Sequence, residues 1–184
     1  MNRKIRLERF DEDALKKIWE VGFRQELPEW AKWNGPYFED YESYSSFQQF
    51  KDSPDCDFLR SENCRCIFAG QRPIGMVSRY WKDEKTRWME IGIVIYDDSC
   101  WHAGCGTEAL SLWTSMTFET FDFLQHIGLT TWSGNRRMMR VAEKLGFLKE
   151  AQIRKVRYWQ GVYYDSVKYG ILREEWSERG SLRK

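Results

Sequence analysis

The chain has 184 residues, a length typical of one domain with room for a sizeable apolar core. Its formal net charge of +1 produces no global field that would draw it to nucleic acid or a membrane surface. No apolar run approaches the roughly 20 residues that span a bilayer, and no apolar stretch of a secretory signal follows the basic start. These features predict a cytoplasmic protein with one domain over residues 1–184, without nucleic-acid or membrane partners.

The N-terminal part predicts one strand followed by helices. Residues 5–10 alternate between apolar and polar side chains, as a half-buried strand does. Asp11 is placed to cap a helix over residues 13–21. A turn is expected at residues 34–36, which read Asn-Gly-Pro, and helical spacing resumes over residues 37–51.

The middle of the chain predicts three strands and then a long helix. Strands over residues 64–69 and 74–81 should form a hairpin with its turn at residues 70–73. A third strand, residues 87–95, leads through a glycine-bearing loop into a helix over residues 104–124. Five cysteines lack paired zinc spacing, so we expect structural thiols and no metal site.

The C-terminal part predicts a strand over residues 128–132 and a helix over residues 135–145. Asn135 should cap this helix and Gly146 should follow its last turn. A closing hairpin turns at residues 159–162. Antiparallel strands, then alternating strands and helices, then a hairpin predict a mixed α/β sheet with helices on both faces.

The most informative motif is the loop Trp-His-Ala-Gly-Cys-Gly at residues 101–106, between an apolar strand and a helix. The N–H groups and dipole of a helix start favour an anion, and Gly104 and Gly106 let the backbone approach it closely. The loop lacks the Lys-Ser/Thr of a P-loop and the third glycine of a dinucleotide fingerprint. It therefore predicts a phosphate site of another kind, with a simple glycine-softened helix start as the alternative.

Three later segments accompany this loop in a fixed order. Residues 135–147 form an Asn-initiated helix ending in Glu-Lys-Leu-Gly-Phe, residues 154–167 read as a closing hairpin, and residues 172–176 read Leu-Arg-Glu-Glu-Trp. Together, from Ile5 to Trp176, these features resemble the GCN5-related N-acetyltransferases (GNAT), and within them the RimJ/RimL-like branch. The resemblance implies the GNAT fold, an α/β single mixed, mostly antiparallel twisted sheet with helices on both faces and a splayed central strand pair.

The resemblance also implies an activity. An enzyme of this kind transfers an acetyl group from acetyl-CoA to a primary amine, either a protein N-terminal α-amine or a small amine, by direct attack in a ternary complex. Acetyl-CoA is the expected co-substrate, no metal is expected, and a homodimer is an expected assembly. Two alternatives remain, a non-catalytic acyl-CoA-binding sensor on the same fold and a generic nucleotide-binding protein.

The resemblance places the cofactor on two neighbouring segments. Pantetheine would pair with the backbone of Ile93, Val94 and Ile95, whose side chains can also belong to the core. The pyrophosphate would lie on the loop and the helix start. The residues concerned are Trp101, His102, Ala103, Gly104, Cys105, Gly106 and Thr107. A Gly-Lys pair is common in the branch where this chain has His102-Ala103, so one phosphate-directed cation is missing.

Further cofactor contacts are implied on the helix that Asn135 begins. Asn135 matches a residue that contacts the pantetheine region, although helix capping alone also accounts for it. Arg137 and Arg140 would meet a phosphate, or they are surface arginines. The chain departs from the family at the usual positions for the acid that protonates the thiolate, because Met138 and Ala142 stand there.

Glu90 is the candidate general base, because it opens the cofactor strand in a Glu-Ile-Gly context. A structural carboxylate is the alternative for this residue. Tyr163 or Tyr164 in the closing hairpin could serve as the acid, and the sequence does not choose between them. The thiolate could also leave unassisted or through water.

An aromatic cluster is the candidate wall of the acceptor site. Its members are Trp30, Trp33, Tyr37 and Phe38. The surrounding segment, residues 26–57, carries eight acids against two bases, whereas residues 136–157 carry eight bases against two acids. The acidic segment suits a cationic acceptor and the basic one suits a polyanionic cofactor; a core cluster and solvated charged faces are the alternatives.

Overall fold

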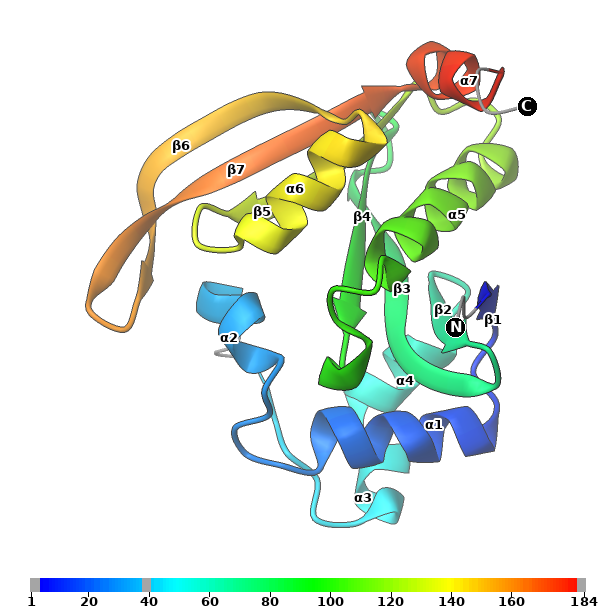
Figure 1. The fold of residues 1–184 in the computed structure, drawn as a ribbon, viewed down its shortest axis with the longest axis vertical. Helices are drawn as coiled ribbons and strands as arrows, with labels where there is room; N and C mark the ends of the chain where they lie inside the picture. The colour runs from blue at the N-terminus through cyan, green and yellow to red at the C-terminus, as the bar shows by residue number, and fades with distance from the viewer. Residues whose placement is uncertain (1–3, 38–40, 182–184) are drawn as a thin grey trace. The chain divides into compact units, whose positions relative to one another are not determined.

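A computed structural model of the chain describes residues 4–37 and 41–181. Within these residues, seven strands form one open sheet in the order β1-β2-β3-β4-β5-β7-β6 (Figure 1). Strands β4 (Trp88–Ile95) and β5 (His126–Trp132) are parallel, whereas β1–β2, β2–β3, β5–β7 and β6–β7 are antiparallel. The predicted mixed, mostly antiparallel sheet with helices is confirmed.

The chain is divided into two compact units, and it passes between them within regular elements. The crossings fall inside β3 (Arg72–Asp83), inside β4, and inside helix α5 (Cys105–Thr120). The first unit contains residues 1–78 and 93–113, and the second contains residues 79–92 and 114–184.

In the first unit, helix α1 (Glu12–Ile18) follows β1 (Ile5–Glu8). The Asp11 carboxylate accepts a hydrogen bond from the Ala14 amide at 2.7 Å, which confirms the predicted cap. The helix continues as one π-helical turn, η1 (Trp19–Phe23). After it come the short helix α2 (Ala31–Asn34) and the 3₁₀ turn η2 (Gly35–Tyr37).

The helix expected over residues 37–51 is largely wrong. Among the described residues of that range beyond Tyr37, only α3 (Phe47–Lys51) is helical. Tyr44 is held in an extended segment, because its amide donates to Phe23 O at 2.8 Å and its carbonyl accepts from Trp19 Nε1 at 2.9 Å. These tertiary bonds override the local helical spacing, and they bury the Tyr44 side chain.

Helices lie on both faces of the strands in the first unit. Cys64 and Cys66 of β2 (Cys64–Ala69) are buried in apolar clusters with residues of α1. Helix α4 (Pro54–Arg60) adds Leu59 to the larger cluster. On the opposite face, the Arg65 guanidinium lies 5.9 Å from the ring centroid of Trp113 in α5.

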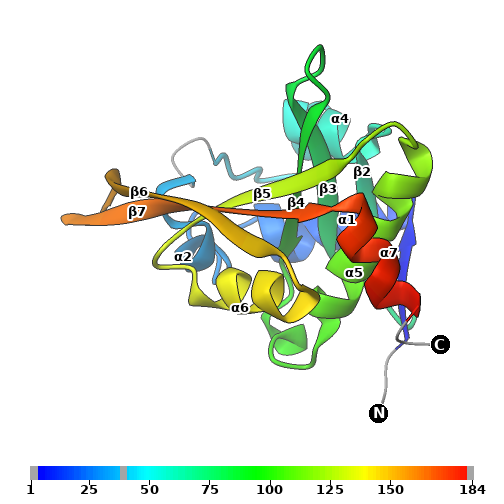
Figure 2. The ribbon, with the colours of Figure 1, turned by 90° about the horizontal axis from the view of Figure 1, so that it is seen from above.

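In the second unit, α6 (Arg136–Leu145) and α7 (Arg173–Ser181) accompany β5 and a long hairpin. The hairpin consists of β6 (Leu148–Trp159) and β7 (Val162–Leu172), which form an extended two-stranded ribbon (Figure 2). Its turn at Gln160 and Gly161 has φ values of 47° and 81°, as the predicted turn requires.

Helix α5 ends at Thr120, four residues before the predicted end at Leu124. The Arg173 side chain explains this early end, because it donates to three backbone carbonyls around the helix terminus. Their distances are 3.1 Å to Phe118 O, 2.7 Å to Phe121 O and 2.6 Å to Leu124 O. A charged donor thus satisfies carbonyls that have no partner within a helix.

Strands β3 and β4 approach closely at Gly75. A Cβ atom at Gly75 would lie 2.2 Å from Val94 O and 2.9 Å from Ile95 Cα, both of which are backbone atoms. Only a glycine therefore lets β3 hold the end of β4 in this position.

We predict that Gly75→Ala lowers the free energy of unfolding by about 3 kcal/mol, the upper range for overpacking. The new methyl group would meet backbone atoms of β4, which cannot move aside by a change of side-chain rotamer. Urea unfolding followed by circular dichroism measures the change. Gly106→Ala is the matched control, because its Cβ would meet only Ile93 Cδ1 at 3.9 Å; it should be neutral or stabilising by up to about 1 kcal/mol. Equal midpoints for the two variants would contradict the close packing.

Candidate functional site

The first unit brings the predicted cofactor strand and the helix start together. Ile93, Val94 and Ile95 are half-buried at the end of β4. The nearest atom to a Cβ built on Gly106 is Ile93 Cδ1, so the first turn of α5 lies against this strand end. Beyond Ile95, the amides of Tyr96 and Asp97 both donate to Ile74 O, at 2.9 Å and 3.1 Å.

The loop between strand and helix is held by its own side chains. A 3₁₀ turn, η3 (Asp98–Cys100), is capped by the Asp97 carboxylate, which accepts from the Ser99 amide at 3.1 Å. The Arg72 guanidinium of β3 pairs with Asp97 and donates to the Ser99 hydroxyl. These contacts fix the loop against the neighbouring strand.

Trp101 anchors the loop to the strand that precedes it. Its indole Nε1 donates to Ile95 O at 3.1 Å. Its ring meets Trp33 edge-to-face at a centroid distance of 6.3 Å, and the Lys32 ammonium lies 5.6 Å from its centroid. An ammonium from α2 therefore lies beside the first residue of a loop that has no lysine of its own.

Two residues of the loop adopt left-handed backbone conformations just before helix α5 begins. His102 and Gly104 have left-handed φ values of 64° and 81°, and nothing lies within 4 Å of a Cβ built on Gly104. His102, Ala103 and Gly104 are exposed. The amide of Glu108 donates to Gly104 O at 3.1 Å, so the first helical turn contains Cys105, Gly106 and Thr107. An α-helix leaves the amides of its first turn without partners inside the helix, which suits an anion.

The second unit holds the other predicted cofactor residues on α6. The Asn135 side chain accepts from the Met138 amide at 3.0 Å, so the predicted N-cap is confirmed. Gly146 ends the helix in a left-handed conformation with φ of 86°, also as predicted. Arg140 is exposed and Arg137 is half-buried.

The aromatic residues of the expected acceptor wall have different surroundings. Trp30 is 6% exposed, donates from Nε1 to Gly22 O at 2.9 Å and packs edge-on against Tyr96, as a core residue does. Trp33 is half-buried and Tyr37 is 37% exposed. Phe38 lies outside the described residues. The core alternative therefore fits Trp30, whereas Trp33 and Tyr37 remain candidates for ligand contact.

Glu90 lies in the second unit and is 2% exposed. Its carboxylate accepts from Tyr80 Oη at 2.8 Å, Thr130 Oγ1 at 2.9 Å and Lys168 Nζ at 3.2 Å. None of these three partners is predicted by the sequence. A carboxylate within an apolar strand indicates that it has a hydrogen-bond or charged partner. The identity of that partner depends on how the strands pair, which the sequence of one strand does not show.

Two tyrosines of the closing hairpin differ in setting. Tyr163 is 61% exposed and lies 5.0 Å from the Tyr158 ring centroid. Tyr164 packs edge-on against Trp132, with centroids 4.7 Å apart. Trp132 is two residues beyond Thr130 on β5, so its side chain shares a face of the sheet with Thr130, which donates to Glu90. Of the two candidate acids, Tyr164 packs on this face of the sheet, whereas Tyr163 is largely exposed.

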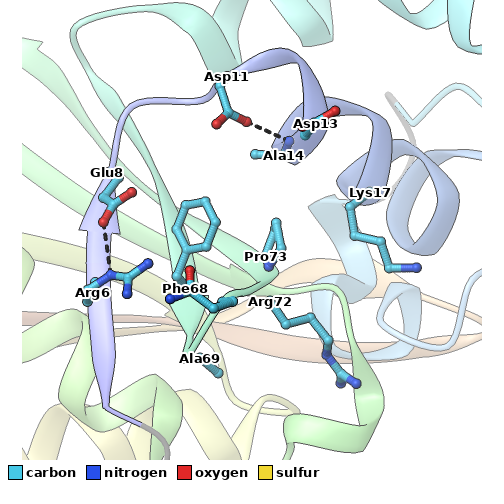
Figure 3. Close-up of a pocket in the computed structure, with 11 residues that line it drawn as sticks. Arg6, Glu8, Asp11, Asp13, Ala14, Lys17, Phe68, Ala69, Arg72 and Pro73 are labelled. Atoms are coloured by element: carbon cyan, nitrogen blue, oxygen red, sulfur yellow. Dashed lines mark hydrogen bonds and ion pairs between the residues drawn. The ribbon is translucent and has the colours of Figure 1, made fainter.

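A separate hollow of about 720 Å³ opens on the first unit, at β1, the start of α1 and the β2–β3 turn (Figure 3). Arg6 pairs with Glu8 at 2.9 Å, and Asp11 accepts from the Ala14 amide. Arg72 is committed to Asp97. Several of the charged groups that line the hollow therefore already have partners within the first unit.

Within residues 4–37 and 41–181, no helix is long and apolar enough to cross a membrane. The same residues include no cluster of three or more His, Cys, Asp or Glu side chains able to hold a metal ion.

Comparison with known proteins identifies a family. Residues 4–148 match the family described as "Acetyltransferase (GNAT) domain". Two Bacillus subtilis relatives are "SPbeta prophage-derived uncharacterized N-acetyltransferase YokL", 45% identical over 28% of this chain, and "Putative ribosomal N-acetyltransferase YdaF", 32% identical over 55% of it. The matches span only 29% and 55% of these relatives' own lengths.

A solved structure agrees in fold. Spermidine N-acetyltransferase from Vibrio cholerae, in complex with CoA and spermine, is similar with a TM-score of 0.73 at 20% identity. The similarity covers 96% of this chain and 99% of that one. At this identity the likeness supports the fold alone.

The cap on α6 generates a prediction that separates two roles of Asn135. Asn135→Ala should lower the free energy of unfolding by about 1 kcal/mol through loss of the cap, and Asn135→Ser should restore most of it. Thermal and urea unfolding measure this difference. If Asn135→Ser recovers the stability but not the affinity for acetyl-CoA, then Asn135 contacts the cofactor in addition to capping the helix. Equal stability of all three proteins would contradict the cap.

The cysteines generate a second prediction. All five are buried. Burial raises the pKa of Cys64 to about 12 and also raises the pKa values of Cys56 and Cys66, so their thiolates are scarce at neutral pH. The native protein should therefore react only slowly with a chromogenic disulfide reagent, and the unfolded protein should expose five reactive thiols. A rapidly reacting thiol in the native protein would contradict this expectation.

Proposed function

Because the chain belongs to the acetyltransferase (GNAT) family, we propose that it transfers an acetyl group from acetyl-CoA to a primary amine. The observation that supports the proposal is the approach of the strand end Ile93–Ile95 to the start of α5, across a loop with two glycines. Within the family we place the chain in the RimJ/RimL-like branch, which the relative named as a ribosomal N-acetyltransferase supports. We assign one acetyltransferase domain to residues 1–184 and a cytoplasmic location.

The proposed cofactor contacts follow the geometry of the two segments. Backbone groups of Ile93, Val94 and Ile95 bind pantetheine, and the amides of the loop and first helical turn bind the pyrophosphate. Trp101 positions this loop through its bond to Ile95 O, and Lys32 supplies a cation beside it. Asn135, Arg137 and Arg140 complete the set of proposed cofactor residues.

The proposed reaction is a direct transfer in a ternary complex. The amine nitrogen attacks the thioester carbonyl, the new C–N bond forms, and the C–S bond breaks to release CoA as the thiolate. A base or water takes the proton of the attacking amine, and Tyr164 is the proposed donor to the thiolate. Glu90 is the carboxylate that the sequence proposes for proton removal, and in the structure it already accepts three hydrogen bonds.

The acceptor belongs to one of two classes, a protein N-terminal α-amine or a small amine. The aromatic surfaces of Trp33 and Tyr37 in an acidic segment favour a positively charged ligand. The spermidine enzyme of similar fold supports the small-amine class, and the ribosomal relative supports the protein class. We further propose a homodimer, which the mass in solution can test.

The test is acetyl-CoA consumption, read as thiol release, against polyamines, amino sugars, amino-acid derivatives and short peptides with free N-termini. We predict turnover with one class of acceptor. Gly106→Val should raise the KM for acetyl-CoA about tenfold, since its side chain covers amides whose bonds to a charged group contribute about 1.5–3 kcal/mol. Gly161→Asn, in an open hairpin turn, is the matched control and should leave KM unchanged.

Each outcome of this assay is informative. Tight acetyl-CoA binding without turnover on any acceptor would favour the non-catalytic acyl-CoA sensor. No acetyl-CoA binding by calorimetry would overturn the cofactor assignment and the role given to the glycine loop.

A further inference from the structure

Glu90 links four strands of the sheet through one buried carboxylate. Its donors are Tyr80 on β3, Thr130 on β5 and Lys168 on β7, and Lys168 Nζ also donates to Thr130 Oγ1 at 3.1 Å. The Lys168 side chain is 26% exposed and that of Glu90 only 3%. We call these four residues the Glu90 cluster.

The cluster lies where two strands part. The parallel ladder of β4 and β5 has two residue pairs, Met89 with Ile127 and Glu90 with Gly128. Thr130, two residues beyond Gly128, is still tied to β4 through the Glu90 carboxylate. Side-chain bonds therefore continue the attachment of β4 to β5 beyond the point at which the backbone ladder ends.

Gly128 of β5 leaves room for the Glu90 side chain. A Cβ at Gly128 would lie 3.2 Å from Glu90 Cγ, so a larger residue would crowd the carboxylate side chain. On the neighbouring strand pair, Thr130 and Lys168 lie directly opposite each other in the β5–β7 ladder. This register delivers a hydroxyl and an ammonium to the same carboxylate oxygen, Glu90 Oε1.

The hydrogen bonds leave little capacity for proton transfer. A carboxylate has about four acceptor positions; in Glu90, Oε1 uses two and Oε2 uses one. A general base has to reach the proton that it removes, and Glu90 is almost fully buried. Removing one partner of a buried ion pair leaves an uncompensated charge, which disturbs the surrounding strands.

We infer that Glu90 and Lys168 are positioning residues, whose ion pair fixes the point at which β4 leaves β5. The pair thereby sets the path of the β4 segment that is proposed to bind acetyl-CoA. The inference rests on the proposed function for its effect on catalysis, but the clamp itself can be observed without turnover.

The test compares Lys168→Met, Glu90→Gln and the double variant. Lys168→Met should raise the KM for acetyl-CoA about tenfold with kcat changed less than about threefold, because the pair acts on binding geometry rather than on proton transfer. Glu90→Gln should show a smaller effect and keep the acidic limb of the kcat/KM–pH profile. The double variant should lose less than the product of the two single effects.

Hydrogen exchange supplies the readout that does not depend on activity. In Lys168→Met, the amides of residues 91–95 and 129–131 should exchange faster than in the unmodified protein. Lys17→Met is the matched control, because it breaks a pair of 2.9 Å with Glu20 that is substantially exposed. It should change neither exchange nor KM.

Two results would overturn the inference. One is a loss of kcat of a hundredfold or more in Glu90→Gln, with an unchanged KM for acetyl-CoA and no acidic limb, which would make Glu90 the base. The other is unaltered exchange of β4 and β5 in Lys168→Met. If the unmodified protein does not bind acetyl-CoA, the proposed function fails, and the exchange measurement alone decides whether the clamp exists.

Discussion

A carboxylate that is removed from water has to be compensated by another charge or by hydrogen bonds, and in this chain the requirement is met at Glu90. Its compensation comes from Tyr80 on β3, Thr130 on β5 and Lys168 on β7, so one buried charge ties β4 to both of its neighbouring strands and to the strand beyond β5. An apolar side chain at this position could slide along its neighbours. A carboxylate with three directional bonds cannot, and the place where β4 and β5 separate is specified accordingly.

Features that depend on a few neighbouring residues were predictable from the sequence. The caps at Asp11 and Asn135, the left-handed Gly146 and the hairpin turn at Gln160 and Gly161 are confirmed. Each is decided within one turn of chain, where side-chain chemistry and backbone conformation act directly on each other. The order of strands and helices followed from the same kind of local pattern.

Features that depend on distant partners were not predictable in this way. The partners of Glu90 are 10, 40 and 78 residues away along the chain, and only the strand register makes them neighbours. The bond from Trp19 to Tyr44 O turned an expected helix into an extended segment. Trp30, a candidate for the acceptor wall, donates to Gly22 O within the core. In each case the outcome was decided by a hydrogen bond to a residue outside the local segment.

The three crossings of the chain inside β3, β4 and α5 bear on how the molecule loses its structure. A polypeptide with one flexible linker between two units can melt in two steps, since either unit opens while the other persists. Here a unit cannot open without fraying a strand or helix that also runs through the other. We therefore expect the two units to unfold together in one cooperative transition.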